Sequence, residues 1–80
     1  MKAIIKVTLK NGVLDPQGKA IQHALGGLGL SGVDEVRQGK LIEMSLKTGN
    51  QDEAREIVEK ACRDLLANAV IENYTYELQN

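Results

Sequence analysis

Aromatic residues, cysteine, histidine and proline are all scarce in this sequence, which contains no tryptophan and no phenylalanine. Tyr74 and Tyr76 are the only aromatic residues, so the core must consist of aliphatic side chains. A single cysteine, Cys62, excludes an internal disulfide and is typical of proteins from reducing compartments. A single histidine, His23, is too little for a metal site, which needs three or four ligands. It also leaves the two serines without a credible catalytic triad.

An excess of charge of either sign is also missing. Ten basic and eleven acidic side chains give a net charge of −1. This balance offers no electrostatic footprint for nucleic acid or an anionic membrane, and we expect neither as a partner. No segment approaches the roughly 20 apolar residues of a membrane span. Lys2, Lys6 and Lys10 interrupt the early apolar run, which does not resemble a signal peptide. We therefore expect one cytoplasmic domain comprising residues 1–80.

The N-terminal segment predicts a strand followed by a tightly specified corner. Residues 2–10 alternate between apolar and polar side chains, as in a half-buried strand. In the corner at residues 11–18, Gly12 allows the chain to turn, and Asp15 followed by Pro16 is a typical helix start. We expect Val13 and Leu14 to pack this corner onto the core.

A first helix is predicted from about residue 16 to residue 27, because apolar side chains recur there at helical spacing. Gly26, Gly27 and Gly29 would end it. Gly18 is the anomaly, since it occupies the third helical position although glycine is a poor helix former. We expect another backbone, within a dimer or from a partner subunit, to approach closely at Gly18.

Residues 33–47 have strand character interrupted by Gln38 and Gly39. Either these two residues form a hairpin turn between strands at 33–37 and 40–47, or Gly39 marks a bulge in one long bent strand. Side-chain parity does not decide, because Val36 and Ile42 would share a face in a continuous strand. We favour two pairing segments.

The clearest helix follows Asn50, where Glu53 three residues later predicts a capping box. Its apolar positions extend to Leu66 without a miss, and Asn68 is a plausible C-cap. A last strand should begin at Val70 or Ile71 and carry the two tyrosines on one face.

The element order predicts an α+β protein, a two-layer βαββαβ sandwich whose sheet is covered on one face by two helices. A domain this small buries only about 60% of the surface of its unfolded chain. We therefore expect dimerisation through the uncovered sheet face or the strand edges.

One sequence motif suggests dinucleotide binding, but the predicted elements around it do not fit such a site. Residues 27–32 match the dinucleotide-binding pattern G-x-G-x-x-G, which needs a strand before it and a helix after it. Here the order is helix then strand, so we interpret the segment as a helix end and loop. Cys62 lies on the apolar side of its helix and is best explained as core filler. The chain lacks the parts of a free-standing enzyme.

Two segments remain as candidate contact surfaces. One is the structured corner at residues 11–18. The other is the cationic turn at residues 37–40, for which the alternative interpretation is an ordinary solvent-exposed turn. The candidate partner-interface residues are Asp15, Pro16, Gln17, Gly18, Arg37, Gln38, Gly39 and Lys40.

The chain as a whole resembles the PurS family, the small subunit of formylglycinamidine ribonucleotide synthase. The resemblance covers essentially the full length. Its one departure is Ala69, where the family often has proline. The residues that carry it are Gly12-Val13-Leu14-Asp15-Pro16-Gln17-Gly18, Ala20-Ile21, Leu28-Gly29, Val33, Val36-Arg37, Gly39-Lys40, Asn68-Ala69-Val70-Ile71-Glu72 and Tyr74.

The resemblance implies an architectural role in the fourth step of de novo purine synthesis. Such subunits form dimers, with tetramers left open, and bring together a glutaminase, PurQ, and a synthetase, PurL. The complex uses glutamine and ATP with magnesium, and the bond-making residues belong to the partners. We therefore expect no catalytic, cofactor-binding or metal-binding residue in this chain.

Two other functions fit the element order. A small-molecule-sensing module with the same βαββαβ order would bind a metabolite at a dimer interface. An acyl-phosphate hydrolase would need an arginine after the first strand, and residues 11–18 contain none. We rank the sensing module second and the hydrolase last.

Overall fold

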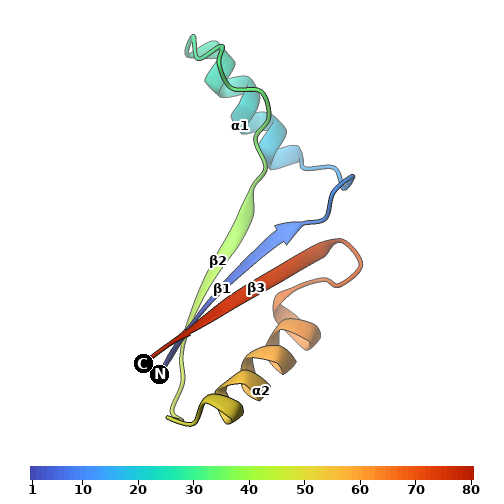
Figure 1. Cartoon of the computed structure of the whole chain (residues 1–80). Helices are drawn as coiled ribbons and strands as arrows, with labels where there is room; N and C mark the ends of the chain where they lie inside the picture. The colour runs from blue at the N-terminus through green and yellow to red at the C-terminus, as the bar shows by residue number, and fades with distance from the viewer.

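The computed structural model describes residues 1–80 and contains a three-stranded antiparallel sheet (Figure 1). Its strands are β1 (Lys2–Leu9), β2 (Gly39–Ser45) and β3 (Glu72–Gln79), in the order β2-β1-β3. The central strand carries the alternation that the sequence predicts, so that one of its faces is wholly buried. The fully buried side chains of this face are Ala3, Ile5 and Val7.

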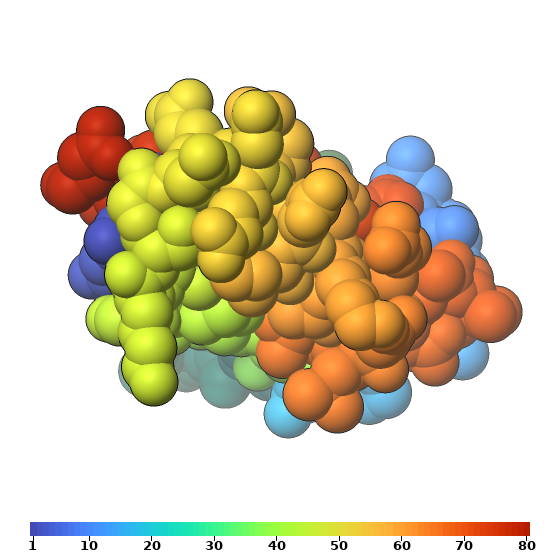
Figure 2. All heavy atoms as spheres, turned by 90° about the horizontal axis from the view of Figure 1, so that it is seen from below, coloured from blue at the N-terminus to red at the C-terminus, as the bar shows by residue number.

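Helix α2 (Gln51–Ala61) packs on this face of the sheet and continues into a π-helical turn, η1 (Cys62–Leu66). Ala54, Val58 and Cys62 are fully buried beneath it. In Figure 2, the atoms of α2 cover the middle of the surface and the start of the chain is visible only at its margin. Neither helix has the length and apolar composition of a membrane span.

The start of α2 confirms half of the predicted capping box. Asn50 Oδ1 accepts a hydrogen bond of 3.0 Å from the backbone N–H of Glu53. The Glu53 carboxylate does not return to the Asn50 backbone, because the Thr48 hydroxyl donates to it at 3.1 Å. That hydroxyl also accepts from the Asn50 N–H at 3.1 Å, so Thr48 takes the place that the capping box assigns to Glu53.

Helix α1 (Pro16–Gly27) lies beyond the end of the sheet (Figure 1). The molecule is therefore elongated, with extents of 49 × 26 × 14 Å and a Cα radius of gyration of 16.1 Å. A compact domain of this length would have a radius of gyration of about 12 Å. The α+β architecture is confirmed, and α2 is the helix that contacts the sheet.

The predicted strand at 33–37 is wrong for the single chain. Residues 33–38 lead directly into β2 at Gly39, without a hairpin turn and without a strand partner. The reason is that β1 ends at Leu9, so no neighbouring strand continues alongside them. A strand needs a pairing partner as well as an alternating sequence, and the isolated chain provides none here.

Candidate functional site

Asp15 joins the two segments that the sequence nominates as contact surfaces. One carboxylate oxygen accepts from the N–H of Gly18 at 2.8 Å, which caps α1, and the other accepts from the N–H of Gln38 at 2.7 Å. The residue is 7% exposed. The pKa of Asp15 is lowered below its ordinary value, mainly by the hydrogen bond from the Gln38 N–H and next by that from the Gly18 N–H. Desolvation opposes this lowering, and the Arg37 charge adds to it. The carboxylate is therefore a structural anion.

The close approach of the Val36 carbonyl explains why glycine occupies position 18 of the helix. A Cβ atom at this position would lie 2.3 Å from the carbonyl oxygen of Val36 and 2.6 Å from Asp15 Oδ2. The expected close approach of another backbone exists, but that backbone belongs to the same chain and not to a dimer mate or partner subunit. Only glycine allows α1 and the segment before β2 to meet at this distance.

Arg37 completes the joint between the two segments. Its guanidinium donates to the carbonyl oxygens of Val13 at 2.9 Å and Lys10 at 3.1 Å. The side chain thus holds the loop between β1 and α1 instead of standing free as a cation. Lys40 lies 3.7 Å from the Glu72 carboxylate across the sheet and is largely exposed.

A groove of about 420 Å³ lies on the outside of this corner. The structure therefore brings all eight predicted residues into one region but divides their roles. Asp15, Gly18 and Arg37 mainly build the corner. The residues that line the groove are Leu9, Leu14, Asp15, Pro16, Gln17, Gln38, Gly39 and Lys40.

Leu14 contradicts its prediction, since its side chain is 85% exposed instead of packed on the core. The corner leads away from the sheet toward α1, and Leu14 does not belong to the core cluster beneath α2. Its apolar character in an exposed corner is the signal that could have marked it as a contact residue.

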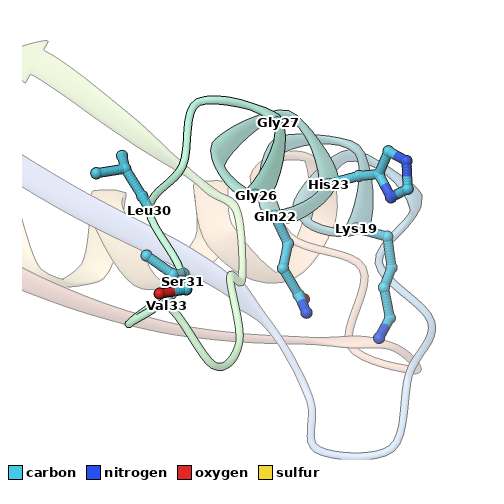
Figure 3. Close-up of a pocket in the computed structure, with 8 residues that line it drawn as sticks. All are labelled: Lys19, Gln22, His23, Gly26, Gly27, Leu30, Ser31 and Val33. Atoms are coloured by element: carbon cyan, nitrogen blue, oxygen red, sulfur yellow. The ribbon is translucent and has the colours of Figure 1, made fainter.

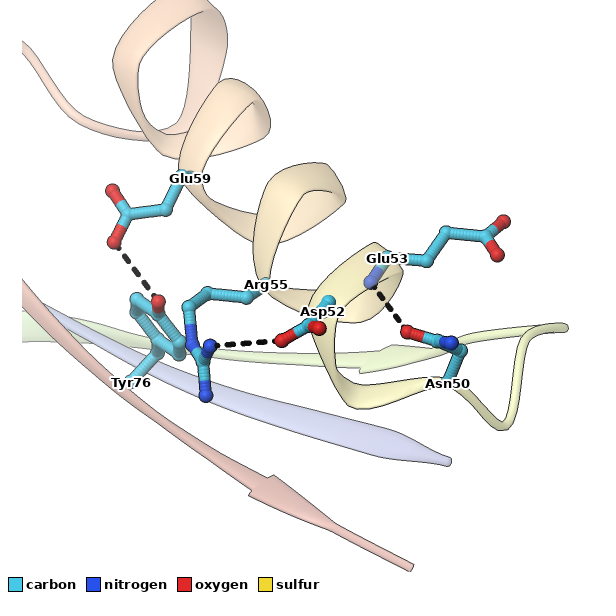
Figure 4. A network of polar contacts seen from close by, with 6 residues as sticks. All are labelled: Asn50, Asp52, Glu53, Arg55, Glu59 and Tyr76. Carbon is cyan, nitrogen blue, oxygen red and sulfur yellow. Dashed lines mark hydrogen bonds and ion pairs between the residues drawn. The ribbon is translucent and has the colours of Figure 1, made fainter.

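A second polar cluster, which the sequence does not predict, links α2 to β3. The hydroxyl groups of Tyr74 and Tyr76 donate to the two carboxylate oxygens of Glu59 at 2.8 Å and 2.9 Å. The pKa of Glu59 is lowered by these two hydrogen bonds, and the bond from Tyr74 has the larger effect. Figure 4 shows Glu59 above Tyr76, with the Arg55–Asp52 pair nearby. The cluster ties the helix to the sheet.

Cys62 and His23, the only cysteine and histidine of the chain, lie on different helices. Cys62 is buried beneath α2, and desolvation raises the pKa of its thiol. His23 projects from α1 at an open pocket of about 490 Å³ beside Lys19 and Gln22 (Figure 3). No group of three or more histidine, cysteine, aspartate or glutamate residues could hold a metal ion. The arrangement presents surfaces for binding.

Comparison with known proteins agrees with this architecture. The family model PurS, described as phosphoribosylformylglycinamidine (FGAM) synthase, matches residues 2–80. The PurS subunit of that synthase from Bacillus subtilis is 44% identical over 78 residues, covering 98% of this chain and 92% of that protein. The Methanocaldococcus jannaschii subunit is 41% identical over 78 residues, covering 98% and 94%.

Solved structures give the same answer. A crystal structure of B. subtilis PurS has a TM-score of 0.88 at 43% identity, covering 99% of this chain and 98% of that chain. A chain in a structure of PurLQS from Thermotoga maritima has a TM-score of 0.85 at 37% identity, covering 95% and 93%. With the family model matched over nearly its whole length, this chain belongs to the PurS family of FGAM synthase subunits.

Proposed function

We propose that this chain is a structural subunit that joins the glutaminase PurQ to the ATP-dependent synthetase PurL, so that ammonia passes between them. The FGAM synthase family places the chain in purine biosynthesis. The observation that carries the bridging role is the corner, where Asp15 and Arg37 fix a preformed groove edged by the exposed Leu14. Holding two active sites in register raises the rate of transfer without any chemistry in the bridge.

The proposal assigns the reaction chemistry to the partners. Cys62 is buried and its thiol is kept protonated, and His23 stands alone on α1. We infer that ATP and magnesium bind elsewhere in the complex and that this chain binds no cofactor. The catalytic residues then belong to PurL and PurQ, in the cytoplasm.

The proposal also includes a dimer of this chain. A single copy is far more extended than a compact domain of 80 residues. It exposes much of its large apolar side chains, including Leu14, Leu28, Leu65 and Val70. Monomeric soluble proteins rarely leave extended apolar surface uncovered, which supports self-association together with partner binding.

Reconstitution tests the bridging role directly. PurL and PurQ from the same organism are assayed with and without this chain, once with glutamine and once with ammonium chloride as the nitrogen source. We expect glutamine-dependent synthesis to require the chain and ammonia-dependent synthesis to proceed without it. Equal glutamine-dependent rates in both mixtures would refute the bridging role.

A matched pair of variants tests the groove. Leu14→Ser removes an apolar side chain that is 85% exposed at the groove, and Leu65→Ser removes one that is 82% exposed on η1, away from it. Neither side chain contributes much to the isolated fold. We expect Leu14→Ser alone to weaken co-purification with the partners. Equal retention of both variants would place the partner contact elsewhere.

The alternative, a small-molecule-sensing module, is not favoured. Its family would be defined by a metabolite site, whereas the matches of this chain are to subunits of one synthase. It predicts a saturable thermal shift with a metabolite in the absence of any protein partner. The bridging role predicts no such shift with glutamine or ATP.

A further inference from the structure

A bridge between two enzymes needs two separate contact surfaces, and the corner groove supplies one of them. A second pocket, of about 400 Å³, lies where the turn between η1 and β3 meets the end of β1 (Figure 1). This β3 pocket flanks β3, whereas β2 forms the opposite edge of the sheet. The corner groove and the β3 pocket share no lining residue, so they are distinct surfaces.

The floor of the β3 pocket is apolar. Cys62 is fully buried beneath α2 and Ala67 is 8% exposed, and both residues line the pocket. Electrostatic attraction is stronger beside such a low-dielectric surface than in open water. The floor therefore favours a ligand that has an apolar stem and a charged end.

The rim of the pocket carries two cations without an acidic partner. Lys10 and Arg63 both line the pocket, and neither side chain forms an ion pair within the chain. The Arg63 charge contributes to the lowered pKa of Glu59, but the two groups are not in ion-pair contact. Both cations are therefore available to an anion from outside.

The one acidic residue of the lining, Glu72, is already engaged. Its carboxylate accepts a hydrogen bond of 2.7 Å from the N–H of Asn68 and lies 3.7 Å from the Lys40 ammonium. Its side chain is only 13% exposed. The rim of the β3 pocket consequently keeps an excess of positive charge.

The turn after η1 fixes the shape of the pocket. The N–H of Ala67 donates to the Cys62 carbonyl at 3.1 Å and closes the π-helical turn. The carbonyl oxygen of Asn68 then accepts from the N–H groups of Ile71 at 3.1 Å and Glu72 at 2.7 Å. Single π-helical turns are rare and occur frequently at functional sites. The pocket is preformed, which lowers the entropic cost of docking.

We propose that the β3 pocket receives an acidic side chain from one of the two partner enzymes, while the corner groove contacts the other enzyme. The inference rests on the bridging role proposed above and names its second contact surface. Charge complementarity identifies the occupant, because its carboxylate would lie between the Lys10 ammonium and the Arg63 guanidinium. A glutamate or aspartate on a partner loop has this chemistry, with methylene groups to pack on the apolar floor.

Charge reversal on the rim tests the pocket in the reconstituted mixture of PurL, PurQ and this chain. The chain is titrated in, and the concentration that gives half-maximal glutamine-dependent synthesis is measured. We expect Arg63→Glu and Lys10→Glu each to raise this concentration about tenfold or more, because like charges then face each other. Lys47→Glu makes the same change at an exposed lysine outside the pocket and should have no effect. Equal effects of all three would indicate general attraction and overturn the inference.

The variants should fold normally. Arg63 and Lys47 are exposed and Lys10 is half-buried, and none of the three forms an ion pair. We expect the wild-type circular dichroism spectrum for each, and Arg63→Glu alone carries the test if Lys10→Glu unfolds. Leu65→Ser remains a valid control for the corner groove, because Leu65 lines neither surface.

Photocrosslinking in the assembled complex identifies the occupant. A benzoylphenylalanine replaces Asn73, an exposed residue of the pocket lining, in one variant and Leu14 in another. We expect the two positions to attach to different enzymes, with an aspartate or glutamate close to the attachment point of position 73. Attachment of both positions to one enzyme, or of position 73 to a second copy of this chain, would overturn the inference.

A small anion is the alternative occupant. Sodium phosphate is added to the isolated chain, and the melting temperature of the wild type is compared with that of Arg63→Glu. We expect no saturable shift in either, because the occupant belongs to a partner enzyme. A saturable shift that Arg63→Glu abolishes would assign the pocket to a small anion and overturn the inference.

The two proposals can fail separately. The need for the wild-type chain in glutamine-dependent synthesis reports the bridging role, and the loss caused by the rim variants reports the β3 pocket. If the wild type is needed but Arg63→Glu titrates like it, the pocket inference is wrong and the bridging role stands. If synthesis proceeds equally without the chain, the bridging role is wrong, and the crosslink from position 73 to a partner enzyme decides the pocket alone.

Discussion

The sheet with α2 and the arm formed by residues 10–38 are stabilised in opposite ways. In the sheet region, the largest fully buried side chains are all apolar or cysteine: Ile5, Val7, Val58 and Cys62. In the arm, the well-buried residues are Asp15 and Gly18, and the contacts between its segments are hydrogen bonds to carbonyl and N–H groups. Burial stabilises one region, and a few polar contacts fix the shape of the other.

The difference follows from the two helices. Helix α2 has an apolar stripe opposite charged residues, and packing against the sheet buries Ala54 and Val58 fully while Ile57 stays 40% exposed. Helix α1 has weaker segregation and leaves Ile21 and Leu28 exposed. A region that is rigid yet uncovered is suited to docking, because its shape is set before a partner arrives.

The largest effect should come from the sheet region. Ile5→Ala empties a fully buried position in the central strand and should reduce the free energy of unfolding by about 2–5 kcal/mol. Urea denaturation followed by circular dichroism measures it. Leu65→Ala is the control, because an 82% exposed side chain should contribute within about 0.5 kcal/mol. Equal losses would mean that apolar burial does not dominate in this region.

The arm should be most sensitive at Gly18. Gly18→Ala places a Cβ against the Val36 carbonyl and should destabilise the protein by about 1–3 kcal/mol, although alanine is the better helix former. Gly26→Ala in the same helix has no atom within 4 Å of the new Cβ and should be neutral or stabilising by up to about 1 kcal/mol. Thermal denaturation of the pair decides, and a stabilising Gly18→Ala would show that the corner can open without loss.

The sequence predicts the sheet region well because its signals are local. The alternation in β1, the Asn50 cap and the stripe of α2 each follow from residues close in sequence, and the structure confirms them. The strand prediction for residues 33–37 was wrong for a physical reason. Alternation indicates a preference for strand pairing, but it does not indicate whether the partner strand lies in the same chain. Leu14 failed because the packing of an apolar residue in a corner depends on where the corner points.

The candidate site was predictable as a list of residues but not as an arrangement. Asp15 was expected to cap α1 and does so. Its second bond, to Gln38, spans 23 residues of sequence and has no local signal. The same holds for Arg37 on the carbonyl oxygens of Lys10 and Val13, and for Glu59 between two tyrosines. Such pairings are set by the fold as a whole.

Acid should weaken both regions through one carboxylate each. The native pKa values of Asp15 and Glu59 are lowered from 3.8 and 4.5, so the stabilisation is complete above those values and is lost as the pH falls through the lowered ones. Asp15→Asn retains a capping oxygen. Between pH 7 and pH 3, its melting temperature should therefore fall by a few degrees less than that of the wild type. Glu59→Gln should do the same for the sheet region. Parallel curves for the wild type and Asp15→Asn would refute the structural role of the arm carboxylate.

The smallest effect separates the two tyrosines that hold Glu59. Tyr74→Phe and Tyr76→Phe each remove one hydroxyl donor and should lower the melting temperature by only about 1–3 °C, because both hydroxyl groups are partly accessible to water. The carboxyl pKa of Glu59, measured by carbon-13 NMR, should rise toward 4.5 in both variants, and more in Tyr74→Phe, since the Tyr74 bond is the larger cause of its lowering. The Asp15 pKa in the same spectra is the internal control and should not move, because no contact links the two carboxylates. A larger rise in Tyr76→Phe would reverse the assignment, and a shift at Asp15 would show that the arm and the sheet region are coupled.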